Sequence, residues 1–215
     1  MQDLPRTIEQ ARLEQERLRD RVETRDRLKA PVFAAGTDVS YQPGGSRAKA
    51  AWAVLKLPEL EIVDRASAET SVDFPYVPGF LSFREIPPLL EAFSELQTLP
   101  DLVVCDGQGI AHPKRFGLAC HLGVILDIPT LGAAKSKLVG DYAEPELLRG
   151  NWSPLVWQEH TVGAALCTKK GTKPLFVSSG HRISLQSSID TVLKLTGKYK
   201  LPETTRAAHA LSKST

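Results

Sequence analysis

Cysteine, aromatic residues and long hydrophobic runs are all scarce in this chain of 215 residues. The three cysteines, Cys105, Cys120 and Cys167, form no C-x-x-C pair, which argues against a disulfide scaffold and indicates small core residues in a reducing compartment. No apolar run approaches the roughly 20 residues that a membrane-spanning helix needs, and the N-terminal residues lack the apolar stretch of a signal peptide. The sequence therefore predicts a cytoplasmic protein that binds no membrane.

Length and composition indicate one globular domain. At about 150 residues per domain, we expect a single unit over residues 1–215, with residues 1–30 forming an N-terminal helix packed on it. A hydrophobic content of 42% suffices for a core without a structural metal.

The small net charge of +2 is the sum of two unlike parts. Residues 161–215 contain nine Lys and Arg against two acids, which is +7 and leaves −5 for residues 1–160. A basic end on an acidic body suggests a polyanionic partner. A solvated lysine face is the alternative that charge alone leaves open.

The hydrophobic pattern predicts a mixed α/β fold. Three strand-like runs with short turns between them predict an antiparallel meander, and a later strand-helix-strand rhythm implies parallel pairing. The order is compatible with a ribonuclease-H-like mixed sheet flanked by helices, among other mixed folds. We expect strands over 32–41, 48–57, 60–71, 102–105, 128–131, 155–157, 162–168 and 175–177, and helices over 7–29, 80–96, 117–126, 184–195 and 202–211.

The stretch after the buried strand 102–105 is the strongest candidate for chemistry. It reads DGQGIAHP over residues 106–113, so a carboxylate ends the strand and two glycines follow. A dinucleotide-binding loop is excluded, because His112 occupies its third glycine position and Pro113 blocks the helix expected there. The glycines instead favour close approach of main-chain groups to a flat ligand. A tight turn in which Asp106 caps the next element is the alternative.

Two further carboxylates stand out from their surroundings. Asp38 lies inside a predicted strand, where an unpaired buried carboxylate is costly, so a metal or a buried Arg or Lys should compensate it. Glu85 lies among apolar residues at the start of a predicted helix, although a first-turn acid favoured by the helix dipole also fits. Three oxygen ligands suit Mg²⁺, with Mn²⁺ able to substitute, and the sequence has no zinc-ligand spacing of His or Cys.

Six blocks of the sequence together resemble the endonuclease V family. They occur in family order, and several are long and unusual. The blocks are GTDVS (36–40), FPYVPGFLSFRE (74–85), DGQGIAHP (106–113), IPTLGAAKS (128–136), SGHR (179–182) and PETTR (202–206).

The resemblance implies a ribonuclease-H-like fold and a DNA repair endonuclease. Its substrate would be DNA containing deoxyinosine, the product of adenine deamination. It would hydrolyse the second phosphodiester bond 3′ to the lesion, with Mg²⁺, and leave 3′-hydroxyl and 5′-phosphate ends. The alternatives are an inosine-specific endoribonuclease and a binding module that reads inosine or branched nucleic acid without cleaving it. We expect a monomer.

The resemblance also implies a role for individual residues. Asp38, Asp106 and Glu85 match the metal-binding acids, and Lys135 and His209 match a basic residue and a histidine beside the reacting phosphate. Tyr76 matches the aromatic residue of a strand-separating wedge, with a core tyrosine as the alternative. The residues expected to contact the DNA or the lesion are Tyr76, Pro78, Gly79, Leu81, Gly107, Gly109, His112, Gly117, Gly180 and His181.

Overall fold

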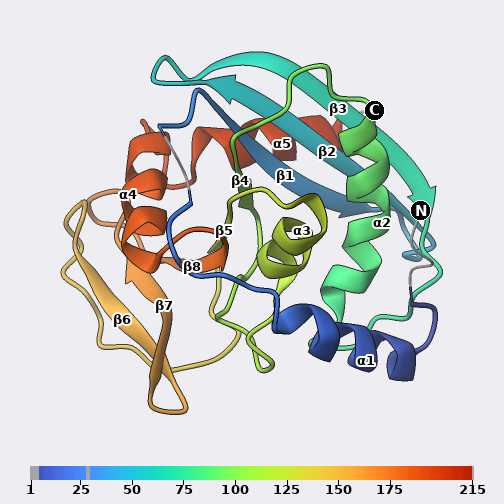
Figure 1. Cartoon of the computed structure of the whole chain (residues 1–215). Coiled ribbons are helices and arrows are strands. Elements are labelled where there is room, and N and C mark those ends of the chain that lie inside the picture. The colour runs from blue at the N-terminus through green and yellow to red at the C-terminus, as the bar shows by residue number, and fades with distance from the viewer. Residues whose placement is uncertain (1–4, 28–29, 215) are drawn as a thin grey trace.

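The computed structural model describes residues 5–27 and 30–214 and is built around an eight-stranded sheet with helices on both faces (Figure 1). Helices α2 and α3 pack on one face, and helices α4 and α5 pack on the other. In chain order the elements are α1 (Ile8–Arg19), β1 (Phe33–Tyr41), β2 (Arg47–Lys56), β3 (Glu61–Ser71), α2 (Leu81–Ser94), β4 (Leu102–Cys105), α3 (Leu118–Leu126), β5 (Thr130–Ala134), β6 (Trp152–Trp157), β7 (His160–Leu166), β8 (Leu175–His181), α4 (Leu185–Leu195) and α5 (Glu203–Lys213).

The strand order is β3-β2-β1-β4-β5-β8-β7-β6. Strands β1 to β3 form the predicted antiparallel meander, and β1, β4 and β5 run parallel to one another. Strands β8, β7 and β6 complete the sheet with antiparallel pairing. The predicted mixed α/β, ribonuclease-H-like arrangement is therefore confirmed. The parallel pairing of β1, β4 and β5 is important for function because the carboxyl ends of these strands lie at the same edge of the sheet.

The core lies on both faces of the sheet. Trp52 of β2 is fully buried under α2, and its indole N–H donates to the Leu89 carbonyl at 2.9 Å. On the other face Val192 of α4 packs in a cluster with Leu131 and Val177. All three cysteines are buried and free, as the sequence predicts.

Helix α1 is shorter than the sequence predicts. Thr7 caps its start as expected, but the helix ends at Arg19, so the predicted continuation through residue 27 is wrong, and residues 28–29 lie outside the described residues. The reason is tertiary, because the chain after the helix forms backbone hydrogen bonds with the end of β8. The Glu23 carbonyl, for example, accepts the Arg182 N–H at 2.5 Å.

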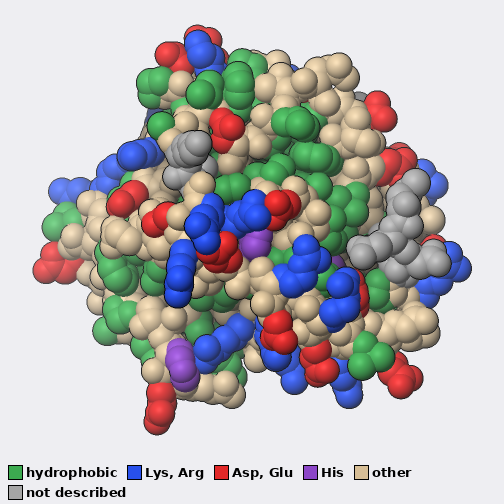
Figure 2. All heavy atoms as spheres, viewed as in Figure 1, with side chains coloured by type: hydrophobic (Ala, Val, Ile, Leu, Met, Phe, Trp, Pro, Cys, Tyr) green, Lys and Arg blue, Asp and Glu red, His purple; other side chains and the backbone are tan. Residues whose placement is uncertain are grey.

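The surface shows no simple separation of charge on the face drawn in Figure 2. Lys and Arg side chains lie among Asp and Glu side chains there, with hydrophobic side chains between them (Figure 2). The charge asymmetry along the sequence therefore does not turn this face into a basic surface. No helix in the described part of the chain is long and apolar enough to cross a membrane.

Candidate active site

The parallel pairing of β1 with β4 places Asp38, inside β1, beside Asp106, which directly follows β4. Thr37 pairs with Cys105 in the parallel ladder, and each aspartate is the next residue along its strand. Cys105 also pairs with Gly132 of β5, so Lys135 lies a short way beyond the same edge. Three blocks that are far apart in the sequence thus meet because their strands are parallel neighbours in this register.

Helix α5 packs directly over Asp38. Alternate residues of a strand point to one face, and Gly36, Asp38 and Ser40 of β1 point towards this helix. At Gly36 the backbone of α5 comes so close that a Cβ atom would lie 2.5 Å from the Thr205 nitrogen. Further along, the Ser40 hydroxyl donates to the Ser212 carbonyl at 2.7 Å. Absence of a side chain at residue 36 is what lets α5 reach the strand.

Two side chains of α5 contact the Asp38 carboxylate and stabilise it. Only 9% of its side chain is exposed, and the His209 Nδ1 lies 3.2 Å from its Oδ2 atom. The Ser212 hydroxyl donates to the same oxygen. The structure thus places a histidine and a hydroxyl here, rather than the buried Arg or Lys that the sequence left open.

Asp106 is paired with Lys135. The lysine Nζ lies 2.5 Å from Asp106 Oδ2, and the carboxylate is more enclosed than the ammonium group. The ion pair joins the end of β4 to the end of β5, and these two strands are neighbours in the sheet.

Glu85 is buried rather than a solvated first-turn acid. It lies beyond the first turn of α2 and is only 8% exposed. Burial, together with the charges of Asp38 and Asp106, raises the pKa of Glu85 to about 8. The Arg84 guanidinium lowers this pKa but does not offset the two acids. The three predicted carboxylates are therefore within electrostatic reach of one another.

The described residues contain no group of three or more His, Cys, Asp or Glu side chains that could hold a metal ion as they stand. Asp38 instead contacts His209 of α5, and Asp106 contacts Lys135. The donor chemistry nevertheless fits Mg²⁺, which prefers carboxylate oxygen ligands. Mutual repulsion of the three acids is also the kind of destabilisation that a divalent cation relieves.

A pocket of about 370 Å³ opens beside Asp106 and Lys135. We call it the strand-edge pocket. Most of the predicted lesion-binding residues line it, and Tyr76 at its rim is 73% exposed, which excludes the core-tyrosine alternative. The predicted residues that line it are Tyr76, Pro78, Gly79, Leu81, Asp106, Gly107, His112, Gly117 and Lys135.

Three residues of the matching blocks, Gly109, Gly180 and His181, do not line the strand-edge pocket. A Cβ atom on Gly109 would overlap the Ser179 carbonyl, and one on Gly180 would overlap Thr130, so both glycines allow close packing of the backbone. His181 pairs with the first residue of β5, at the edge of the sheet opposite Lys135. Its Nδ1 accepts the Glu23 N–H at 3.2 Å, which holds the chain after α1 in place.

Sequence reasoning missed other residues of this region. Ser212 bonds to Asp38, and Gln108, Lys137 and Leu138 line the strand-edge pocket. Gln108 and Lys137 flank matched positions in the chain, which could have indicated them. Nothing local to Ser212 indicates its partner 174 residues away.

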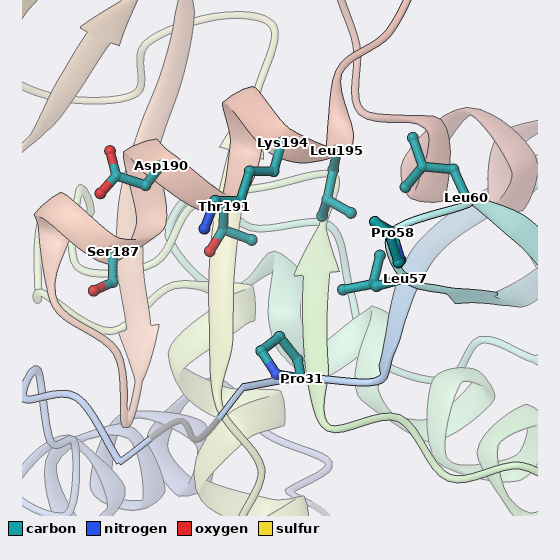
Figure 3. A pocket seen from close by; sticks show the side chains of 9 residues that line it. All are labelled: Pro31, Leu57, Pro58, Leu60, Ser187, Asp190, Thr191, Lys194 and Leu195. Atoms are coloured by element: carbon teal, nitrogen blue, oxygen red, sulfur yellow. The ribbon is translucent and has the colours of Figure 1, made fainter.

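A second pocket, of about 390 Å³, lies between α4 and the turn after β2 (Figure 3). Leu57, Pro58 and Leu195 form an apolar wall, whereas the Asp190 carboxylate points away from them (Figure 3). None of the predicted site residues lines this α4 pocket.

Comparison with known proteins decides the family. The family model for endonuclease V matches residues 16–210. The chain belongs to the endonuclease V family. It is 51% identical over 209 residues to Endonuclease V of Nostoc punctiforme, which covers 97% of this chain and 95% of the relative. Membership identifies the chain as a nuclease.

Solved structures of endonuclease V have the same fold. The Streptomyces avermitilis enzyme superposes with a TM-score of 0.94 at 45% identity, covering 98% of this chain and 93% of the other. Ciona intestinalis Endonuclease V superposes with a TM-score of 0.84 at 29% identity, covering 96% and 97%. That structure is a complex with a 23mer DNA that contains an inosine followed by a ribo-adenosine.

Proposed function

We propose that this chain is a metal-dependent DNA repair endonuclease that recognises deoxyinosine. It hydrolyses the second phosphodiester bond 3′ to the lesion and leaves 3′-hydroxyl and 5′-phosphate ends. The observation that carries the proposal is the meeting of Asp38, Glu85 and Asp106 beside a pocket of about 370 Å³. The inosine-containing DNA bound by the Ciona relative supports the choice of substrate.

Asp38, Glu85 and Asp106 are the residues that would hold the metal. A bound Mg²⁺ supplies a water of lowered pKa and neutralises charge at the phosphate, and Mn²⁺ is expected to substitute. Lys135 stands beside Asp106, where its ammonium group offsets negative charge that develops on the phosphate.

His209 holds or moves a proton at a phosphate oxygen. Its Nδ1 faces the Asp38 carboxylate, so an Nδ1–H donated to Asp38 leaves Nε2 as the acceptor in the neutral ring. Half of the histidine side chain is exposed, which leaves that second nitrogen accessible to substrate.

Recognition of the base takes place in the strand-edge pocket. Hypoxanthine presents O6 as an acceptor and N1–H as a donor, the reverse of adenine, and main-chain groups around Gly107 and Gly117 can read that edge. The base must leave the stack, at a cost of a few kcal/mol that weak inosine pairing reduces. Tyr76, exposed and followed closely by Pro78, fills the vacated space.

A nicking assay on a labelled duplex with one deoxyinosine tests this proposal. We expect a Mg²⁺-dependent product whose length marks the second 3′ phosphodiester, no product in EDTA, and at least a roughly hundredfold lower rate for Asp106→Asn. Asp190→Asn makes the same change in the α4 pocket and should leave the rate within about twofold. Undiminished cleavage by Asp106→Asn would reject the site.

The same assay separates DNA cleavage from RNA cleavage. The Ciona complex contains a ribo-adenosine directly after the inosine, which makes an inosine-specific endoribonuclease the second candidate. A parallel substrate with one ribose at that position distinguishes the two. A rate at least tenfold higher on the ribose substrate would favour the endoribonuclease.

A further inference from the structure

Another hollow, separate from the α4 pocket, adjoins the strand-edge pocket on the side of helix α1. It has a volume of about 540 Å³ and lies between α1 and the segment from Pro78 to Phe80. We call it the α1 groove. Its lining includes Arg12 and Gln15 from the helix, and Pro113 and Lys114 from the loop before α3.

The two hollows share a boundary. Pro78, Gly79, His112 and Leu138 line both the strand-edge pocket and the α1 groove. Pro78 and Gly79 follow Tyr76 after one residue, Val77, so this boundary belongs to the same loop as the exposed aromatic ring.

Contacts from α1 and from the loop before α3 hold the boundary in place. Gln15 is only 2% exposed, although it lies on a mostly solvated helix, and its side-chain amide donates to the Gly79 carbonyl at 3.1 Å. The same nitrogen is 3.5 Å from the Phe116 carbonyl. His112 is also buried, and its Nδ1 accepts the Lys114 N–H at 3.2 Å. Because the buried Gln15 amide links two loops, the fold fixes the position of the boundary between the two hollows.

The chemistry of the α1 groove suits a nucleic acid strand. Arg12 and Lys114 are exposed, come from different elements, and form no ion pair among the described residues. Glu16 is the single acid among the described lining residues. Between the charges lie Pro78, Phe80 and Pro113, whose apolar surfaces suit the face of a base.

We propose that the α1 groove binds the complementary strand of the substrate duplex at the position opposite the lesion. This inference depends on the proposed function, in which Tyr76 fills the space vacated by the base, and on the strand-separating role that the family resemblance implies for its loop. A loop inserted between two strands has one on each side, and the strand-edge pocket holds the lesion strand. The hollow on the other side of Pro78 and Gly79 then faces the partner strand. Arg12 and Lys114 contact its phosphates, and the apolar surface supports the unpaired base.

The proposal predicts a loss that is confined to duplex DNA. We compare Arg12→Gln with Lys114→Gln, singly and combined, and measure affinity in EDTA for inosine oligonucleotides that are single-stranded or paired. The double variant should bind the duplex about tenfold more weakly and bind the single strand within about twofold of the unchanged chain. The slope of log affinity against log salt for the duplex should fall by about 2, one for each phosphate contact.

A control with the same change in net charge is available. Arg19 lies on α1 outside the groove and Lys194 lies on α4, so the combined Arg19→Gln and Lys194→Gln variant reports general electrostatic attraction. Its duplex affinity should fall less than threefold. Equal losses for the control and the groove variant, equal losses on both substrates, or no loss at all would overturn the proposal. If the unchanged chain does not distinguish inosine from adenine, the proposed function fails instead.

Discussion

Replacing Gly36 with alanine should displace the helix that completes the site. The new Cβ atom would lie 2.5 Å from the Thr205 nitrogen, and nearer still to the Thr204 carbonyl. These are backbone atoms of α5, so no side-chain rotation relieves the overlap. Since ordinary contacts between such atoms are about 3.5 Å, the helix has to retreat by roughly 1 Å.

A displacement of α5 should lower the catalytic rate because this helix positions His209. The helix carries His209 to a distance of 3.2 Å from Asp38, and 1 Å more exceeds hydrogen-bonding range. We expect Gly36→Ala to lose about 1–3 kcal/mol of stability from overpacking. A misplacement of about 1 Å in an active site can cost about a hundredfold in rate, so kcat should fall by that order.

Urea unfolding and the nicking assay measure the two effects on the same preparation. Gly197→Ala is the matched control, because its Cβ atom would meet only the Glu203 carboxylate, at 3.4 Å and at the end of a flexible side chain. The free energy of unfolding of this control should stay within about 0.5 kcal/mol of that of the unchanged chain, and its nicking rate should stay within about twofold. A Gly36→Ala protein with an unchanged kcat would refute the reasoning, because α5 would then not position His209.

Two pH dependences follow from buried groups. Burial and the neighbouring acids raise the pKa of Glu85 to about 8 from its ordinary value of 4.5, so the folded state binds the extra proton. Stability without metal should therefore fall as pH rises from about 4.5 to 8, by at most about 1.4 kcal/mol per pH unit. Urea unfolding in EDTA should show that Glu85→Gln removes this slope, and identical slopes in the two proteins would contradict it. Burial lowers the pKa of His121 to about 3 from 6.5, so its contribution to stability is lost as pH falls below 6.5. His121→Phe should flatten that acid limb in thermal melts relative to the unchanged chain, and a parallel acid limb would reject the assignment.

Much of the site could be predicted from sequence because its residues stand in unusual local contexts. A carboxylate inside a strand, such as Asp38, and a carboxylate followed by two glycines, such as Asp106, conflict with ordinary packing and so attract attention. Their meeting also follows from sequence, given parallel strands that end at one edge. Ser212 was missed because a serine near the end of a helix conflicts with nothing local.

Membership of a matching block proved a weaker guide to position. Gly109, Gly180 and His181 lie in blocks that match the family, yet they pack the backbone of β8 or hold the chain after α1. A position in a matching block therefore does not by itself indicate contact with substrate, since a close approach of two backbones demands glycine as strictly as a ligand does.

The sequence by itself determined the class of fold, the three acids and the family resemblance, because alternation of apolar residues and local motifs are read along the chain. The tertiary structure decided the end of α1, the packing of α5 over Asp38 and the α1 groove beside the loop that carries Tyr76. Each of these depends on contacts between residues far apart in the sequence, such as the 171 positions that separate Asp38 from His209. Such contacts are set by how closely two backbones can approach, and local sequence does not state which backbones will meet.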